Sequence, residues 1–240
     1  MLFRSLGVME KTKSNVDRIY FALRQMAANF DFKPDARINE GNLAAQLHAS
    51  RTPVREALNR LVAEGFLTFK SGHGFFCRSL SPGRILDLYQ ARVAIECEAV
   101  RLACQRASDE DIAALAVYLD AIEPEYSTCQ DSIALLALDE EFHLQIVGLS
   151  GNDELLGMLK ILNDRIRYVR MINLGAMRDN HPNAVGDSAK MSAHRTILEA
   201  LQCRDLDGVV AAMRAHIERR REDATKAVRI AYSQLYVPAD

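Results

Sequence analysis

The chain has 240 residues, of which 49% are hydrophobic and 26% are charged, proportions that suit a globular protein with a buried core. No run of 18 apolar residues occurs, so we expect no membrane-spanning helix. The five cysteines include no C-x-x-C pair, which favours reduced thiols and a cytoplasmic protein. Residues 1–78 hold 12 basic and 7 acidic side chains, whereas residues 79–240 hold 18 and 25. The basic N-terminal part suggests a polyanionic partner.

The first 78 residues show the order helix, helix, turn, helix and two-stranded hairpin. Hydrophobic spacing predicts helices over about 14–29 and 39–47, and a third helix that begins after residue 50. Thr52 is expected to cap the third helix, with Pro53 in its first position, where an N–H would have no intrahelical partner. Gly65 suits the residue that follows its end. Residues 66–70 and 75–78 are predicted strands of a small wing.

The first turn of the third helix carries the side chains that we expect to contact DNA. Those expected to face outward there are Ser50, Arg51, Thr52 and Arg55. An arginine fork can span the O6 and N7 acceptors of guanine, whereas hydroxyls and Lys70 would hold phosphates. The alternative is that Arg51, Arg55 and Arg60 form a solvated helix face. The wing and the proline at the helix start favour DNA binding.

A boundary is predicted at residues 79–83, which would link a DNA-binding domain (1–78) to a helical domain (84–236). Hydrophobic periodicity then predicts helices over about 86–106, 108–124, 130–149, 152–177, 187–203 and 205–235. Pro124 would end or interrupt the second of these, and residues 179–186 would form a loop. The predicted fold class is mainly α: an N-terminal winged helix-turn-helix with a small β-hairpin, and a C-terminal antiparallel all-α bundle of about six helices.

One carboxylate and three histidines lie near the predicted inward faces of three different helices. Asp139 and His143 are four residues apart and share a helix face, and His194 and His216 each belong to the apolar stripe of a later helix. Imidazole and carboxylate donors suit Zn, Ni, Mn or Fe, and four of them would leave coordination positions for a ligand. The alternative is that these are ordinary hydrogen-bonded histidines of the core or the surface. A di-iron centre is disfavoured, because neither His194 nor His216 has a glutamate three residues earlier.

A longer motif spans the second and third predicted helices and carries a family resemblance. It reads Leu43-Ala44…Leu47…Ser50-Arg51-Thr52-Pro53-Val54-Arg55-Glu56-Ala57-Leu58, followed by Glu64-Gly65-Phe66-Leu67. This pattern resembles the winged helix-turn-helix of the GntR family of bacterial transcription regulators. The resemblance implies that Arg51 and Arg55 contact bases, that Thr52 contacts a phosphate or a base, and that Gly72 enters the minor groove.

The sequence departs from this family pattern at three positions. Phe30 and Asp35 stand where the family usually has glycines in the turn before the second helix. Gly41 stands where the family often has a basic residue, so one expected phosphate contact is missing from its usual place.

The helical part from about residue 84 to 227 resembles the FCD effector-binding domain of the FadR branch of this family, and six helices would place it near the VanR-like subgroup. The matching pieces include Leu88-Tyr89…Arg92…Glu96, Asp139-x₃-His143, Ser150-Gly151-Asn152, His194…Ile197 and Met213…His216. In metal-binding members, the positions of Asp139, His143, His194 and His216 hold the ion. The resemblance therefore implies a divalent metal, with Zn expected first and Ni, Mn or Fe as alternatives.

The sequence thus predicts a homodimeric, cytoplasmic, ligand-responsive regulator, usually a repressor in this family, that binds a pseudo-palindromic DNA operator. A small organic acid would complete the metal coordination, with Arg92 and Arg167 as candidate effector-binding residues because arginine suits carboxylates. Each arginine has an alternative role, Arg92 in a pair with Glu96 and Arg167 in a solvated face. Two other interpretations remain, a metal-dependent hydrolase and a regulator whose helices only dimerise.

Overall fold

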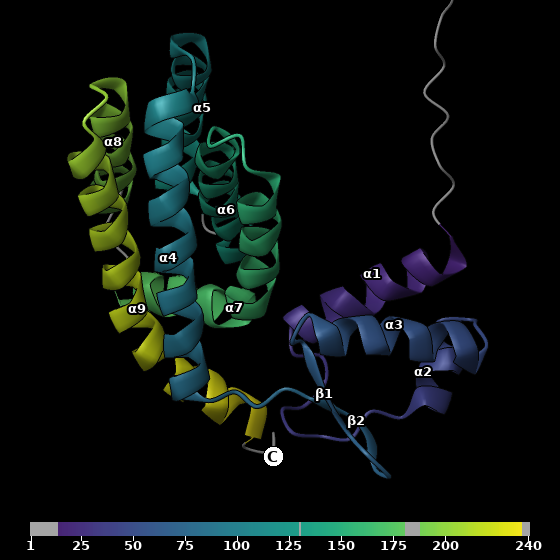
Figure 1. Cartoon of the computed structure of the whole chain (residues 1–240). Helices are drawn as coiled ribbons and strands as arrows, with labels where there is room; N and C mark the ends of the chain where they lie inside the picture. Colours follow the sequence, from purple (N-terminus) through teal and green to yellow (C-terminus); the bar gives the residue numbers. More distant parts are fainter. Residues whose placement is uncertain (1–13, 130, 181–187, 237–240) are drawn as a thin grey trace, which may run out of the picture. The chain divides into compact units, whose positions relative to one another are not determined.

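The computed structural model describes residues 14–129, 131–180 and 188–236 (Figure 1). The chain divides into two compact units, Met1–Arg78 and Ser79–Asp240. The described residues are mainly helical, with one two-stranded antiparallel sheet. Among them, no helix is both long enough and apolar enough to cross a membrane.

The N-terminal unit is a winged helix-turn-helix, as predicted. Its elements are α1 (Asn15–Ala28), α2 (Glu40–Gln46), α3 (Arg51–Ala63), β1 (Leu67–Lys70) and β2 (Gly74–Cys77). Leu67 pairs with Cys77 and Lys70 with Gly74 in the antiparallel hairpin. The apolar side of α1 packs on that of α3, so that residues such as Leu23 and Leu58 are fully buried between them. This packing leaves the polar face of α3 exposed to solvent.

The start of α3 differs from the prediction. Ser50, not Thr52, is the residue before the helix, and Pro53 is the third helical residue rather than the first. Proline is tolerated there because the first four N–H groups of a helix have no intrahelical partner. The end of the helix is as predicted, since Gly65 follows it with a φ of 77°, a conformation that glycine adopts without steric cost.

Two positions that lack the family's usual glycines still adopt the left-handed conformation. Phe30 has a φ of 56° and Asp35 a φ of 61°. Such values are uncommon for residues with a Cβ atom, so the turn before α2 is held by its surroundings. Phe30 is buried, and the Arg78 guanidinium lies 4.5 Å from its ring centroid.

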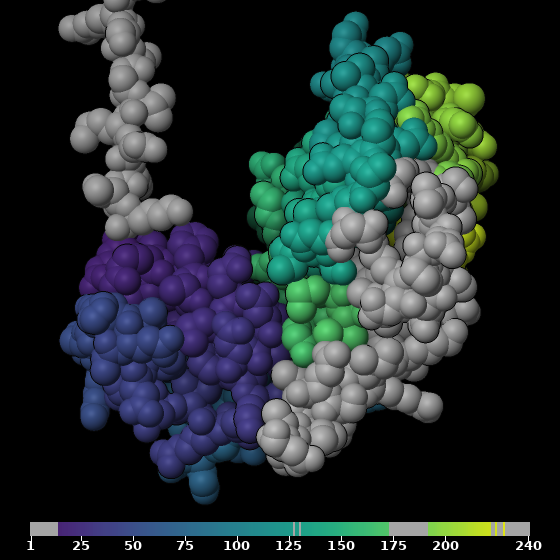
Figure 2. All heavy atoms as spheres, turned by 180° about the vertical axis from the view of Figure 1, so that it is seen from behind, coloured from purple at the N-terminus to yellow at the C-terminus, as the bar shows by residue number. Residues whose placement is uncertain are grey.

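The C-terminal unit contains six described helices. They are α4 (Pro82–Arg106), α5 (Asp109–Thr128), α6 (Ser132–Gly148), α7 (Asp153–Asn180), α8 (Ser188–Gln202) and α9 (Leu206–Tyr236). α4 packs against α6, α7, α8 and α9, so it forms the centre of the bundle (Figure 1). Seen from behind, α5 and α6 form much of the visible surface of this unit (Figure 2).

Three boundaries in this unit differ from the predictions. α4 begins at Pro82, inside the segment 79–83 that was expected to be a linker, because proline suits the first turn of a helix. Pro124 neither ends nor breaks α5, which continues for one more turn to Thr128. α7 continues to Asn180, and most of the predicted loop at 179–186 lies outside the described residues.

Candidate DNA interface and metal centre

The exposed face at the start of α3 borders a concave surface. Ser50, Arg51, Thr52 and Arg55 are all exposed. The groove has a volume of about 840 Å³, and its lining comprises Arg37, Ile38, Asn39, Glu40, Gly41, Arg51, Thr52, Arg55, Glu56, Asn59 and Gly74. Three of the side chains predicted to contact DNA, Arg51, Thr52 and Arg55, therefore share one surface with α2 and the wing.

The wing carries the other two predicted DNA contacts. Lys70 is exposed at the end of β1, and its Nζ lies 4.6 Å from the centroid of the Phe76 ring. Gly72 has a φ of 74°, and no atom lies within 4 Å of the position that a Cβ would occupy. A tight turn with open space around it is suited to close approach of a DNA backbone.

Arg60 does not share the solvated face of Arg51 and Arg55. Its Nη1 lies 3.0 Å from Asp17 Oδ1, and its guanidinium stacks 3.8 Å from the centroid of the Tyr20 ring. Tyr20 in turn donates a hydrogen bond of 2.7 Å to Glu64 Oε1. These contacts attach the C-terminal turns of α3 to α1, so Arg60 supports the orientation of α3.

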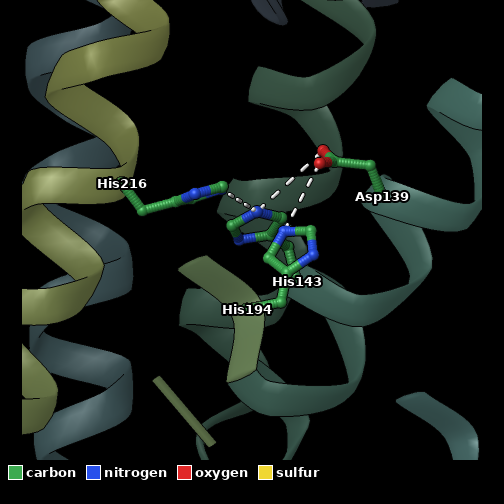
Figure 3. A group of neighbouring side chains, drawn as sticks. All are labelled: Asp139, His143, His194 and His216. Carbon is green, nitrogen blue, oxygen red and sulfur yellow. Dashed lines mark hydrogen bonds and ion pairs between the residues drawn. The ribbon is translucent and has the colours of Figure 1, made fainter. Parts of the chain in front are cut away.

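The structure brings Asp139, His143, His194 and His216 together in the interior of the helical bundle (Figure 3). Asp139 and His143 come from α6, His194 from α8 and His216 from α9. All four are buried, and one potential ligand atom from each lies within 4.8 Å of all the others. Residues that are up to 77 positions apart in sequence thus form one cluster of three nitrogen donors and one oxygen donor.

The distances in this cluster suit a metal ion. Two donors of a tetrahedral zinc site lie about 3.3–3.4 Å apart. Here His143 Nε2 is 3.1 Å from His216 Nε2, and His194 Nε2 is 3.4 Å from Asp139 Oδ1. Neither ring nitrogen of His194 has a hydrogen-bond partner among the described residues, although the side chain is fully buried. Such buried, unpaired nitrogens are costly unless they bind a ligand, so the donor set fits a divalent metal.

The protonation states also favour metal binding. Burial lowers the pKa of His143, although the Glu96 carboxylate opposes this shift. Burial, together with the neighbouring His194 and His143, lowers the pKa of His216 well below its usual value. Burial alone would raise the pKa of Asp139, but the Arg170 charge and the neighbouring His194 ring outweigh it and hold that pKa well below its usual range. Neutral imidazoles and an ionised carboxylate are the states that bind metals.

An acidic side chain on α4 orients the first histidine of this cluster. Glu96 is fully buried and forms a hydrogen bond with His143 Nδ1, which leaves Nε2 facing the cluster. Arg92, one turn earlier, pairs with the other oxygen of Glu96. Burial alone would raise the pKa of Glu96, but Arg92 and His143 outweigh this effect and lower the pKa of Glu96 to about 2. A carboxylate behind a histidine ligand fixes the tautomer and the direction of the ring.

A second set of charges holds the carboxylate ligand. Arg170 on α7 pairs with Asp139 Oδ2, and its Nη1 lies 3.3 Å from Glu140 Oε1. Arg167 Nη1 lies 2.7 Å from Glu140 Oε2. Arg220 Nη2 is 3.8 Å from Asp139 Oδ1. Both oxygens of Asp139 also face the cluster, since Oδ1 lies 3.4 Å from His194 Nε2 and Oδ2 lies 3.9 Å from His143 Nε2.

Glu96, Arg170 and Arg220 surround the four donors in the structure, although the sequence alone does not predict a role for them at this site. The alternative role predicted for Arg92, a pair with Glu96, is present in the structure, but the pair is buried rather than solvated. Arg92, Glu96 and Arg170 are all buried in the bundle, and Arg92 is only 1% exposed. The spacing of Arg92 and Glu96, four residues apart on a helix with apolar neighbours, was the signal available for a buried pair.

Replacing Glu96 with glutamine is expected to weaken zinc binding by about 10- to 100-fold, because an uncharged amide holds His143 less firmly. Competition with a chromogenic chelator measures the affinity, and ¹⁵N NMR of the histidine rings reports whether Nδ1 of His143 still carries the proton. Glu98→Gln is the matched control, since Glu98 lies on the same helix but is exposed and pairs with Arg101. Equal zinc affinities and tautomers in the two variants would contradict this role for Glu96.

A winged helix-turn-helix with an exposed basic helix face, followed by a helical unit with a buried polar cluster, defines a DNA-binding transcription regulator rather than an enzyme. The family comparisons agree: residues 15–77 match the model described as "Bacterial regulatory proteins, gntR family", and residues 87–219 match the FCD domain. The chain belongs to the GntR family, and its helical unit is an FCD domain.

Curated relatives span nearly the whole chain. The "Nta operon transcriptional regulator" of Aminobacter aminovorans is 42% identical over 211 residues, which cover 88% of this chain and 95% of the relative. The "HTH-type transcriptional repressor GlaR" of Escherichia coli is 29% identical over 201 residues, with 78% and 85% covered. Among solved structures, Escherichia coli McbR/YncC has the same fold, with a TM-score of 0.65, 24% identity, and 92% and 98% covered.

Proposed function

We propose that this protein is a repressor that senses a small carboxylate at a divalent metal held by Asp139, His143, His194 and His216. The buried cluster of these four donors carries the proposal, because it fits a metal and contains unpaired histidine nitrogens. Three imidazoles and one carboxylate suit zinc, with nickel, manganese or iron as alternatives. When bound, the ion would supply open coordination positions for an acidic ligand.

The charges around the cluster favour an anionic effector. Four arginines (Arg92, Arg167, Arg170, Arg220) pair with three carboxylates (Glu96, Asp139, Glu140), so these side chains carry a net charge of +1 before a metal binds. With the histidines neutral, a divalent cation adds two positive charges that no further carboxylate of the cluster offsets. In a buried site such an excess is costly, so a ligand that brings negative charge is preferred.

Arg92 and Arg167 are the proposed contacts to the effector. Arg92 uses one edge of its guanidinium for Glu96, while its buried Nη2 has no hydrogen-bond partner among the described residues. Arg167 is partly exposed and bonded to Glu140, so an effector would have to compete with that carboxylate. Arg92 is therefore the stronger candidate, because a buried unpaired donor gains more from a new partner.

We further propose that the protein acts in the cytoplasm as a homodimer whose two winged units bind half-sites of a pseudo-palindromic operator about one helical turn apart. In the DNA-binding unit, Ser50, Arg51, Thr52, Arg55, Lys70 and Gly72 are the proposed contacts. The effector would release DNA only if it favours a conformation with low DNA affinity. The relative GlaR is named a transcriptional repressor, which supports repression, and the six helices among the described C-terminal residues support the VanR-like subgroup.

The proposal predicts that an effector stabilises the protein and releases DNA only when the metal is present. Sugar acids, hydroxy acids and dicarboxylates are screened by the melting temperature of the zinc-loaded protein. The operator is first selected from a library of randomised duplexes. An acid that raises the melting temperature is expected to lower operator affinity by about 5- to 150-fold, the usual range of coupling between sites.

Chelator-treated protein is the control for this experiment, and it should bind operator without responding to the acid. An equal response with and without metal would contradict sensing at the cluster. If neither zinc nor any acid bound, the remaining interpretation, a helical unit that only dimerises, would replace the proposal.

A further inference from the structure

The groove beside α3 has a second wall, formed by the segment that precedes α2. This segment is attached to the wing as a short additional strand, with Arg37 in an antiparallel bridge to Phe76. Ile38 N donates to Phe75 O at 2.8 Å, and Cys77 N donates to Ala36 O at 3.0 Å. Hydrogen bonds on both sides of Arg37 therefore hold its backbone rigidly against β2.

The Arg37 side chain is exposed and lines the same groove as Arg51 and Arg55. Its guanidinium lies near the wing, about 3.9 Å from the position of a Cβ built on Gly74. Among the described residues it forms no ion pair and no hydrogen bond. Arg37 thus presents an unneutralised cation from a rigid backbone, at the opposite wall from the first turn of α3.

Arg37 also decides the sign of the charge in the groove. The lining contains two acidic side chains, Glu40 and Glu56, and the arginines of α3 only balance them. With Arg37 included, the groove carries a net charge of +1. Because a DNA backbone is drawn to positive potential, this one residue changes a neutral groove into an attractive one.

Position 41, where the family often has a basic residue, cannot easily supply this charge. A Cβ on Gly41 would lie 3.2 Å from Asn39 Oδ1 and 3.3 Å from Arg51 Nη2. The glycine thus leaves room for the guanidinium of Arg51 beside α2, and a longer side chain would crowd it. The positive charge missing from α2 has to come from elsewhere on the groove.

We propose that Arg37 is a DNA phosphate contact, which supplies from the wing side the charge that Gly41 lacks. A phosphate contact positions the protein but does not read sequence, so its loss should weaken binding to unrelated duplexes equally. Each phosphate contact to B-DNA contributes about −0.9 to the slope of log affinity against log salt concentration. Arg37 therefore has a measurable signature that does not require the operator.

The test uses the full-length protein and two fluorescein-labelled 30-base-pair duplexes of unrelated mixed sequence, titrated over a series of salt concentrations. Arg37→Gln is expected to make the slope of log affinity against log salt concentration shallower by about 0.9 for each DNA-binding unit that contacts the duplex. At 0.1 M salt this corresponds to binding that is roughly 8-fold weaker per unit, on both duplexes. Arg37→Lys should retain the wild-type slope. Lys33→Gln is the control, because Lys33 is an exposed basic residue of the same segment that does not line the groove.

Three results would overturn the proposal. An unchanged slope in Arg37→Gln would show that no phosphate contact was lost. A loss in Arg37→Lys as large as in Arg37→Gln would show that the charge is not what matters. A loss confined to one duplex would indicate base reading instead. Melting curves of both variants should match the wild type, since the Arg37 side chain has no partner within the described fold.

Discussion

Replacing Arg51 and Arg55 together with alanine is expected to abolish specific DNA binding and leave the fold intact. Both side chains are exposed in the first turns of α3 and line the groove between α2 and the wing. A bidentate arginine–guanine contact contributes about 1–3 kcal/mol of discrimination against a wrong base, and each DNA-binding unit carries both arginines. The operator affinity should therefore fall about 1,000-fold or more, to the level of non-specific binding.

Electrophoretic mobility shifts with the selected operator, at moderate salt and with excess competitor DNA, measure this loss. The matched control is the double variant Arg101→Ala and Arg214→Ala, which removes one partly exposed and one exposed arginine from the helical unit. It lowers the charge of the protein by the same amount but should leave operator affinity within a few-fold of wild type. An operator affinity of the Arg51 and Arg55 variant that equals the wild type's would refute the assignment of these two side chains as base contacts.

The second large effect is expected at the metal cluster. Replacing His194 with alanine removes one of four donors, and zinc affinity should fall more than about 100-fold, beyond the cost of losing an outer partner such as Glu96. A ligand that binds only the folded state stabilises it by about 2.7 kcal/mol when present at 100 times its Kd. Zinc should therefore raise the melting temperature of the wild type but not of His194→Ala at the same concentration.

Metal analysis after growth with added metal, and melting curves with and without chelator, test this expectation. Thr196→Ala, an exposed position two residues further along α8, controls for a change in that helix, and His73→Ala controls for the loss of a histidine elsewhere. The His194→Ala variant should keep its affinity for the mixed-sequence duplexes, because its winged unit is unchanged. Zinc stabilisation that persisted in His194→Ala would exclude the cluster as the metal site.

Local signals in the sequence were sufficient to predict most of the helices and strands. Long amphipathic stretches such as those of α8 and α9 repeat with the helical period over many turns, and their predicted ends differ from the observed ones by one residue. Errors occurred where one residue type is compatible with two structures. Pro124 is tolerated within α5, and Pro53 is tolerated at the third position of α3 rather than the first.

Some residues of the candidate sites could be predicted from local signals and others could not. The exposed residues of α3 could be predicted from sequence, because the direction of a side chain on an amphipathic helix follows from its position relative to the buried stripe. The burial of Arg92, Glu96 and Arg170 could not be predicted, because a charged residue gives no sign of being buried until its neighbours from other helices are known. The role proposed for Arg37 could not be predicted either, because it depends on a groove that the α2 region, α3 and the wing form together.

The sequence by itself determined that the chain has a winged helix-turn-helix followed by a helical FCD domain, because caps, periodicity and a contiguous motif act within a few turns of chain. It also indicated which histidines and which aspartate lie on inward helix faces. Only the tertiary structure decided that these four donors, from three helices, come within 4.8 Å of one another. It decided as well that Glu96 orients His143, since such contacts depend on how helices distant in sequence pack together.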